Sequence, residues 1–207
     1  GILLTHAHIG HYAGLIHLGR EVMGTKSTPV HTMPRMEKFL RTQGPWSQLV
    51  SLENIRLSSM RDGRAFSLNK RLRVTPFLVP HRDEFSETVG FQIEGPAKKI
   101  LWLPDIDKWE KWKTPLEKVL KDVDIAYLDG TFFANGELPG RDMSKIPHPF
   151  ITETMTRLKD QPASLRSRVR FIHLNHTNPA HDSDGTAAAQ IRKAGMRVAK
   201  QGERVEL

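Results

Sequence analysis

The stretch THAHIGHYAGL, residues 5–15, decides how this sequence is interpreted, because it places three histidines within six residues. His6 and His8 are two positions apart, so on a strand their side chains point to the same side. If the strand ends near His8, a turn can bring His11 back toward the other two rings. Imidazole is the most common side-chain ligand of zinc and similar ions. The stretch therefore predicts half of a metal centre.

The composition of the chain limits what this metal centre can be. The 207 residues are 38% hydrophobic and 26% charged, which is the balance of one globular domain. The chain has no cysteine, so any metal must be held by His, Asp or Glu. No apolar run approaches the ~20 residues of a membrane span, and we expect no membrane partner.

The chain is basic, with 31 Lys and Arg against 23 Asp and Glu and a formal net charge of +8. A basic surface favours anionic partners. The alternative is a basic surface that serves solubility alone. We expect a small-molecule or phosphorylated substrate, and the basic balance leans slightly toward a phosphorylated one. Nucleic acid is a possible partner by charge alone, but no motif of a nucleic-acid-binding module supports it.

Strands and helices alternate along the chain, which predicts a layered α/β fold with ligands at the strand ends. The expected strands cover residues 1–8, 30–32, 55–79, 89–95, 98–105, 123–130 and 169–176. The expected helices cover residues 11–23, 34–42, 115–121, 150–159 and 184–194, and residues 196–207 predict a hairpin-like pair of strands.

Polar residues follow several of these strands at the point where each strand ends. His81 follows a strand in VPHRDEF, Asp105 follows another in LPDID, and His176 follows a third in FIHLNHTNP. Taken singly, each is more often a loop or capping residue. Their shared position at strand ends makes them candidates for the rest of the metal centre.

The motifs HAHIGH, the His81 loop, LPDID and NHTNP occur in the order of the metallo-β-lactamase fold superfamily. The sequence resembles this superfamily, and within it the pyrroloquinoline quinone biosynthesis protein B-like branch. The likeness runs across nearly the whole chain and includes GPWSQLV, VPHRDEFSETVGF, PDIDKWEKW and GELPGRDMSKIPHPFI.

This resemblance implies a single metallo-β-lactamase-like domain over residues 1–207, an αββα sandwich that lacks its N-terminal strands here. Gly1 is not an initiator methionine, and GILLTHAH resembles the interior of a strand. We therefore expect the natural chain to continue upstream. The compartment, cytoplasmic or periplasmic, then stays open, because a signal peptide would lie in that upstream part.

The resemblance also implies two adjacent metal sites. Its ligand set is His6, His8 and His81 for the first ion, His11 and His176 for the second, and Asp105 bridging both. Gly10 stands where the family has an aspartate ligand, so the second site is weaker or is completed by water or another residue. Asp83 and Asp107 are nearby carboxylates, but we favour a surface or capping role for each. We expect one or two Zn²⁺ ions, with Mn²⁺ or Fe²⁺ as alternatives.

Further residues are candidates for catalysis. LDGTFF followed by IPHPFITETM resembles phosphodiesterase-like members in which a histidine lies near the reacting phosphate, and His148 matches that histidine. Asp129 could orient His148 as a general acid, and the alternative is a histidine at a helix entry. We expect His173 to support a metal ligand rather than to bind metal itself.

Three tryptophans, Trp102, Trp109 and Trp112, cluster after one strand. They could line a substrate pocket, although packing in the core is the reading that we prefer.

The function that we expect is a metal-dependent hydrolase with Asp105, His148 and Asp129 as its catalytic residues. A metal-activated water would attack an ester, phosphodiester or lactam-like bond. The alternatives are an accessory metalloenzyme of pyrroloquinoline quinone-type cofactor biosynthesis, a β-lactamase, and a non-catalytic metal-binding protein, for which Gly10 is the main support. A homo-oligomer remains open.

Overall fold

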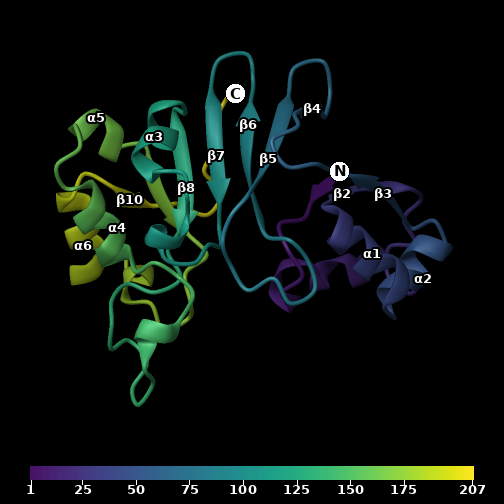
Figure 1. The fold of residues 1–207 in the computed structure, drawn as a ribbon, viewed down its shortest axis with the longest axis horizontal. Coiled ribbons are helices and arrows are strands. Elements are labelled where there is room, and N and C mark those ends of the chain that lie inside the picture. The colour runs from purple at the N-terminus through teal and green to yellow at the C-terminus, as the bar shows by residue number, and fades with distance from the viewer. The chain divides into compact units, whose positions relative to one another are not determined.

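The computed structural model describes residues 1–207, which fall into two compact units. Unit 1 comprises Gly1–Arg64, Pro76–Leu78 and Arg82–Val89, and unit 2 comprises Ala65–Thr75, Val79–His81 and Gly90–Leu207. Figure 1 shows the elements of both units, with purple and blue ribbons in unit 1 and mostly teal, green and yellow ribbons in unit 2. The expectation of one domain over the whole chain stays a prediction.

Unit 1 is built on a small parallel sheet with strand order β1-β2-β3. Its strands are β1 (Ile2–Leu3), β2 (Thr28–Thr32) and β3 (Ile55–Ser59), and its helices are α1 (Pro34–Thr42) and α2 (Trp46–Ser51). Buried apolar residues from these elements form one core cluster: Leu4, Ala7, Tyr12, Leu15, Val30, Met36, Leu40, Trp46, Leu49 and Ile55. The start of the histidine-rich stretch thus belongs to the core of unit 1.

Helix α1 covers the predicted range, residues 34–42, and its local sequence explains why. Pro34 occupies the first helical turn, where its missing N–H costs nothing. Met36 and Leu40 are four residues apart and both are buried, so one face of the helix packs into the core. Glu37 and Arg41 pair at 2.8 Å on the outer face.

Unit 2 contains most residues of a seven-stranded sheet with the order β10-β9-β8-β7-β6-β5-β4. The strands are β4 (Phe66–Ser67), β5 (Arg73–Leu78), β6 (Val89–Glu94), β7 (Lys99–Leu103), β8 (Ile125–Asp129), β9 (Val169–Ile172) and β10 (Arg197–Val198). Strands β7 to β10 are parallel, whereas β6 is antiparallel to β7 and β4 is antiparallel to β5. The carboxyl ends of β7, β8 and β9 therefore meet at one edge of the sheet.

The helices of unit 2 are gathered beside the parallel half of this sheet (Figure 1). They are α3 (Leu116–Lys121), α4 (Ile151–Leu158), α5 (Ala163–Arg166) and α6 (Thr186–Lys193). β8 is buried along its whole length, as expected of a central parallel strand. No helix in the structure is both long enough and apolar enough to span a membrane.

Two predicted elements are wrong. The helix expected over residues 11–23 is instead a pair of short 3₁₀ helices, Ile9–His11 and Ala13–Leu18, and Val22 is 63% exposed. The C-terminal hairpin is also absent. β10 pairs in parallel with β9, and Val205 and Leu207 pack against the sheet residues Ile100, Ile125 and Tyr127. The apolar residues that suggested a second strand thus cover the sheet face.

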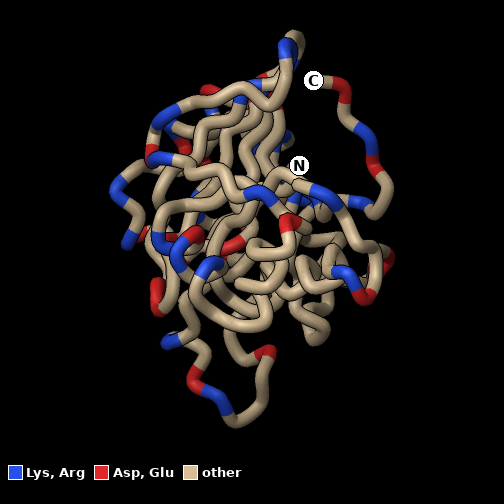
Figure 2. Tube along the Cα trace, turned by 90° about the vertical axis from the view of Figure 1, so that its right-hand side faces the viewer, with Lys and Arg blue, Asp and Glu red and all other residues tan.

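Charged residues are spread along the trace, with no long block of either sign (Figure 2). The C-terminal segment, residues 199–207, carries both basic and acidic positions, among them Lys200 and Glu203. The basic balance of the sequence therefore belongs to the surface as a whole rather than to one strip.

Candidate metal centre

In unit 1, the histidine-rich stretch follows β1 directly, and strand β2 and the loop around Ser86 fix the backbone on either side of His6. The N–H of Leu4 donates to the carbonyl of His31 at 3.1 Å. The N–H of Ala7 donates to Ser86 Oγ at 2.7 Å. His6 is only 1% exposed, so its ring is held inside the unit.

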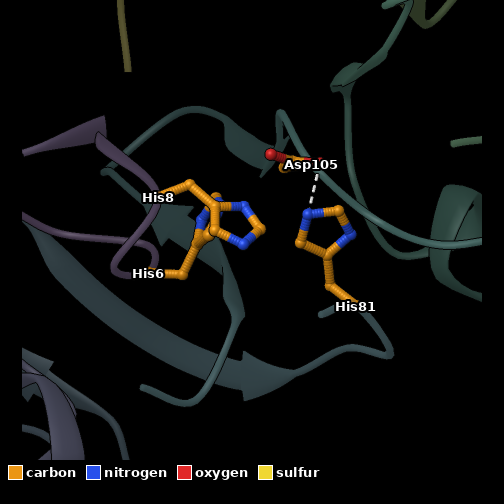
Figure 3. A group of neighbouring side chains, drawn as sticks. All are labelled: His6, His8, His81 and Asp105. Atoms are coloured by element: carbon orange, nitrogen blue, oxygen red, sulfur yellow. Dashed lines mark hydrogen bonds and ion pairs between the residues drawn. The ribbon is translucent and has the colours of Figure 1, made fainter. Parts of the chain in front are cut away.

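Hydrogen bonds connect the rings of His6 and His8 to each other and to Glu84, and the His11 ring packs against His6. His6 Nε2 lies 2.8 Å from His8 Nδ1, and Figure 3 shows the two rings against each other. His8 Nε2 lies 2.9 Å from Glu84 Oε2, and this hydrogen bond lowers the pKa of the Glu84 carboxyl. The His11 ring centroid is 4.2 Å from that of His6. Unit 1 therefore brings together the three histidines that the sequence singled out.

The space around Gly10 would accommodate a side chain. A Cβ atom built on Gly10 meets no heavy atom within 4 Å, and the residue is exposed. The glycine is therefore not required by a close approach of the backbone to another group. Its consequence is chemical, because glycine has no side-chain atom that could bind a metal ion between His8 and His11.

In unit 2, four titratable side chains come from the edge where the parallel strands end. Asp105 follows β7, Asp129 is the last residue of β8, and His173 follows β9. His148 comes from the loop before α4. One donor atom of each of these residues lies within 4.8 Å of those of the others. We call Asp105, Asp129, His148 and His173 the strand-end cluster.

The carboxylates of the strand-end cluster are deeply buried, with Asp105 3% exposed and Asp129 0% exposed. His148 Nδ1 lies 2.8 Å from Asp129 Oδ2 and 3.2 Å from Asp105 Oδ1. His81, whose side chain is also fully buried, places Nε2 3.2 Å from Asp105 Oδ1, as the dashed line in Figure 3 marks. Burying two carboxylates is costly unless cations or several hydrogen bonds stabilise them.

Thr131 organises the cluster. Its hydroxyl donates to Asp129 Oδ1 at 2.7 Å and lies 2.8 Å from His173 Nδ1. Because that hydroxyl proton points to Asp129, His173 Nδ1 is the donor in the second contact. His173 then presents Nε2 as its lone-pair atom, which is how an outer partner orients a metal-binding histidine.

The backbone of His173 is unusual as well, with a φ of 62°. Left-handed backbone costs on the order of 1–3 kcal/mol in a residue other than glycine, and such residues concentrate at functional sites. The strand therefore ends in a conformation that turns His173 into the cluster.

His176 has a different position from the other predicted ligands. Both His176 and His173, three residues earlier, are exposed, but only His173 belongs to the strand-end cluster. Asp107 accepts from Lys108 N and from Lys111 Nζ, both at 2.7 Å. Asp83 accepts from Thr88 Oγ1 at 2.8 Å. Both carboxylates thus have local partners of the kind expected for capping and surface residues.

Reasoning from the sequence missed Thr131 and Glu84. Both are single polar residues in loops, and nothing in their spacing sets them apart. A hydroxyl two residues after Asp129 is a weak signal, because threonine is common after strands.

Comparison with known proteins gives the family. A family model described as "Beta-lactamase superfamily domain" matches residues 1–174. "Coenzyme PQQ synthesis protein B" from Rhizobium meliloti (strain 1021) is 24% identical over 227 residues, covering 100% of this chain and 71% of that protein.

Two solved structures have a similar fold. Zn(2+)-bound PqqB from Methylobacterium extorquens has a TM-score of 0.78 at 22% identity, covering 99% of this chain and 70% of that one. The metallo-beta-lactamase fold protein YhfI from Bacillus subtilis has a TM-score of 0.64 at 14% identity, covering 97% of this chain and 74% of that one.

These comparisons confirm the mixed α/β fold of metallo-β-lactamase type that the sequence predicted. The likeness to coenzyme PQQ synthesis protein B extends over the entire chain, as the resemblance also predicted. Since the family model covers far more than half of the residues, the chain belongs to the beta-lactamase superfamily.

Proposed function

We propose that this chain is an accessory metalloenzyme of coenzyme PQQ-type cofactor biosynthesis. The observation that carries the proposal is the similarity to coenzyme PQQ synthesis protein B over the full length of the chain. The sequence alone favoured a general hydrolase, with this function as an alternative. The named relative supports the alternative better.

The residues at the strand ends fit a divalent metal ion. The carboxylates of Asp105 and Asp129 are buried. One possible ligand atom from each of them and from two imidazoles, those of His148 and His173, all lie within 4.8 Å of one another. A mixed set of imidazoles and carboxylates suits zinc, manganese and iron. We propose that Asp105, His173 and His81 of unit 2 bind metal. In unit 1, His6, His8 and His11 stay predicted metal ligands, as the family resemblance implies. A bound ion would supply Lewis acidity toward a substrate oxygen.

His148 is suited to move a proton at this site. Its Nδ1 contacts Asp129 Oδ2 at 2.8 Å, and Asp129 is fully buried. A buried carboxylate on one ring nitrogen fixes the tautomer and stabilises the imidazolium form. The other ring nitrogen, Nε2, is then the atom that gives a proton to a substrate or takes one from it.

Hydrolysis is the second candidate, and the His148–Asp129 pair is the observation that favours it. A general acid beside buried carboxylates is what cleavage of an ester or phosphodiester requires. The same pair also serves a cofactor-forming reaction, so substrate tests must separate the two candidates.

The experiment deletes the gene for coenzyme PQQ synthesis protein B in Rhizobium meliloti and supplies the gene that encodes this chain. Coenzyme PQQ is then measured by mass spectrometry of the culture. We expect production to return with the unchanged chain and to be lost with Asp105→Asn. Asp107→Asn is the matched control, because Asp107 has only local partners and the variant keeps an acceptor for Lys108 N. We expect it to behave as the unchanged chain does.

A parallel assay tests the second candidate on zinc-loaded protein. The panel contains bis(p-nitrophenyl) phosphate, p-nitrophenyl acetate and nitrocefin. Failure to restore coenzyme PQQ together with zinc-dependent turnover of any of these compounds would overturn the biosynthetic proposal in favour of hydrolysis. Restored PQQ production with no turnover would do the reverse.

A further inference from the structure

In unit 1, the two ring nitrogens of His8 face two different groups. Nε2 lies 2.9 Å from Glu84 Oε2, and Nδ1 lies 2.8 Å from His6 Nε2. Glutamate is ionised at neutral pH, and an ionised carboxylate can only accept a hydrogen bond. In a neutral His8 ring, Nε2 is therefore the protonated nitrogen and Nδ1 carries the lone pair. Glu84 thus decides which nitrogen of His8 is available to a metal ion.

The same direction of donation continues through His6. Because His8 Nδ1 accepts, His6 Nε2 donates to it. His6 Nδ1 is then an acceptor, and Thr5 Oγ1 lies 3.1 Å from it as the donor. One carboxylate therefore sets the positions of three hydrogen atoms. His8 Nδ1 already carries its lone pair, whereas His6 Nε2 must give up a proton before it can bind a metal ion.

The loop that carries Glu84 is attached to the first turn of α1. Arg35 Nη2 donates to the carbonyl oxygen of Asp83 at 2.8 Å and to that of Glu84 at 3.4 Å. The backbone N–H of Arg35 donates to the Glu87 carboxylate at 3.1 Å. The backbone of Glu84 is thus held in place on the side away from His8, independently of its own side chain.

The backbone next to His8 is attached to the same loop. Ala7 N donates to Ser86 Oγ at 2.7 Å, and Ser86 Oγ donates to the carbonyl oxygen of Glu87 at 2.9 Å. Exposed ion pairs usually contribute little, because two flexible side chains must be ordered. The side chains of His8 and Glu84 are 21% and 47% exposed, but both backbones are anchored, so less freedom remains to be lost.

We propose that Glu84 is a positioning residue, which holds His8 with Nδ1 toward His6 as the metal-binding atom. Glu84 belongs to neither group of candidate metal ligands, so it acts through His8. The outer partner of a metal-binding histidine orients the ring and fixes its tautomer in this way. The metal-binding part rests on the proposed function, whereas the orientation and tautomer of His8 do not.

The first experiment determines the tautomer of His8 in the metal-free chain by long-range ¹H–¹⁵N NMR, with His8→Gln to identify its signals. We expect Nε2 to be protonated in the unchanged chain. In Glu84→Leu, which has no acceptor, the form with Nδ1 protonated should appear. Glu84→Gln keeps an acceptor oxygen and should show less of that form. Glu21→Leu is the matched control, because Glu21 is an exposed glutamate of unit 1 that pairs with Arg20. It should not change the tautomer.

The second experiment adds zinc from a chelator-buffered series and follows the His8 signals of the same proteins. We expect zinc at Nδ1 with Nε2 still protonated. Glu84→Leu should weaken this binding about tenfold, the lower end for an outer partner, because Glu84 is partly exposed. Glu84→Gln should weaken it less, and Glu21→Leu should leave it unchanged.

Three results would overturn the proposal: the same His8 tautomer in Glu84→Leu as in the unchanged chain, zinc bound through Nε2, or equal zinc affinities in Glu84→Leu and Glu21→Leu. Failure of the proposed function has a different signature. A chain in which Glu84 fixes the His8 tautomer but which binds no zinc supports the positioning of His8 and contradicts the metal centre.

Discussion

At the scale of single residues, we predict opposite effects on zinc binding for substitutions at His173 and at His176. Both side chains are exposed, but His173 lies in the strand-end cluster with its Nδ1 hydrogen-bonded to Thr131, whereas His176 lies outside the cluster. We expect His173→Gln to weaken zinc binding at least tenfold, the scale seen when even the outer partners of a metal ligand are lost. His176→Gln should leave it unchanged. Competition titration against a fluorescent zinc chelator measures both, and the reverse order would support His176 rather than His173 as the ligand.

Gly10 offers a gain-of-function test. Because a Cβ at this position meets nothing within 4 Å, Gly10→Asp should fold as the unchanged chain does. The new carboxylate would supply the ligand that the family resemblance places there. We expect the number of zinc ions per chain to rise toward two in elemental mass spectrometry. Gly10→Asn, of the same shape but without the charge, is the control. An equal rise in both variants would show that the carboxylate is not the cause.

The sequence predicts members of the strand-end cluster where a potential metal ligand stands at the carboxyl end of a strand. Asp105 and Asp129 end buried strands, and parallel strands bring their carboxyl ends together, so their proximity followed from the pattern. The position of His173 could not be inferred in this way. It depends on a left-handed backbone and on Thr131, and neither has a signature in the order of the residues.

At the scale of elements, α4 is connected to the loop after β7 by one buried hydrogen bond. Trp109 Nε1 donates to Thr154 Oγ1 at 2.9 Å, and both residues are buried. Thr154→Val keeps the shape but removes the acceptor, so we expect the free energy of unfolding to fall by about 1–3 kcal/mol. Urea denaturation measures the loss. Thr156→Val, on the exposed side of the same helix, should cost clearly less, and equal costs would refute this assignment.

The C-terminal segment should respond to pH through Glu203. Burial alone would raise the pKa of Glu203, but the Tyr127 hydroxyl and the Arg170 charge together lower it. A lowered pKa in the folded state contributes stability above the usual value of 4.5, and this contribution disappears as the pH falls through the folded value. Glu203→Gln should therefore be less stable than the unchanged chain at pH 7, and the difference should vanish in acid. If the difference in the free energy of unfolding between the two proteins were the same at every pH, the Glu203 carboxylate could not be its source.

Elements were predictable where local signals and packing agree. Pro34, the apolar spacing of α1 and the break after it specify that helix without tertiary information. The helix predicted over residues 11–23 is wrong because Gly14 and Gly19 disfavour a continuous helix, and the chain forms 3₁₀ turns instead. The hairpin predicted for the C-terminal residues is wrong for another reason. Their alternation fits a strand, but they gain more by covering Ile100 and Ile125.

At the scale of the whole molecule, metal binding should stabilise the native state. A ligand that binds only the folded chain adds about 2.7 kcal/mol when its concentration is 100 times its dissociation constant. We expect zinc to raise the midpoint of thermal unfolding and EDTA to reverse the rise. Asp105→Asn should reduce the response, while Asp107→Asn should keep it. A midpoint that is indifferent to zinc in the unchanged chain would contradict a metal centre.

The open space at Gly10 also bears on how this chain can change through mutation. Every glycine codon becomes a codon for aspartate or glutamate when its second base changes from guanine to adenine. No neighbouring atom stands in the way of the first atom of such a side chain. A single nucleotide therefore separates this chain from a variant with an acidic residue between His8 and His11. The gain or loss of an acidic side chain at this position is therefore one mutational step, and it should meet little selection against misfolding.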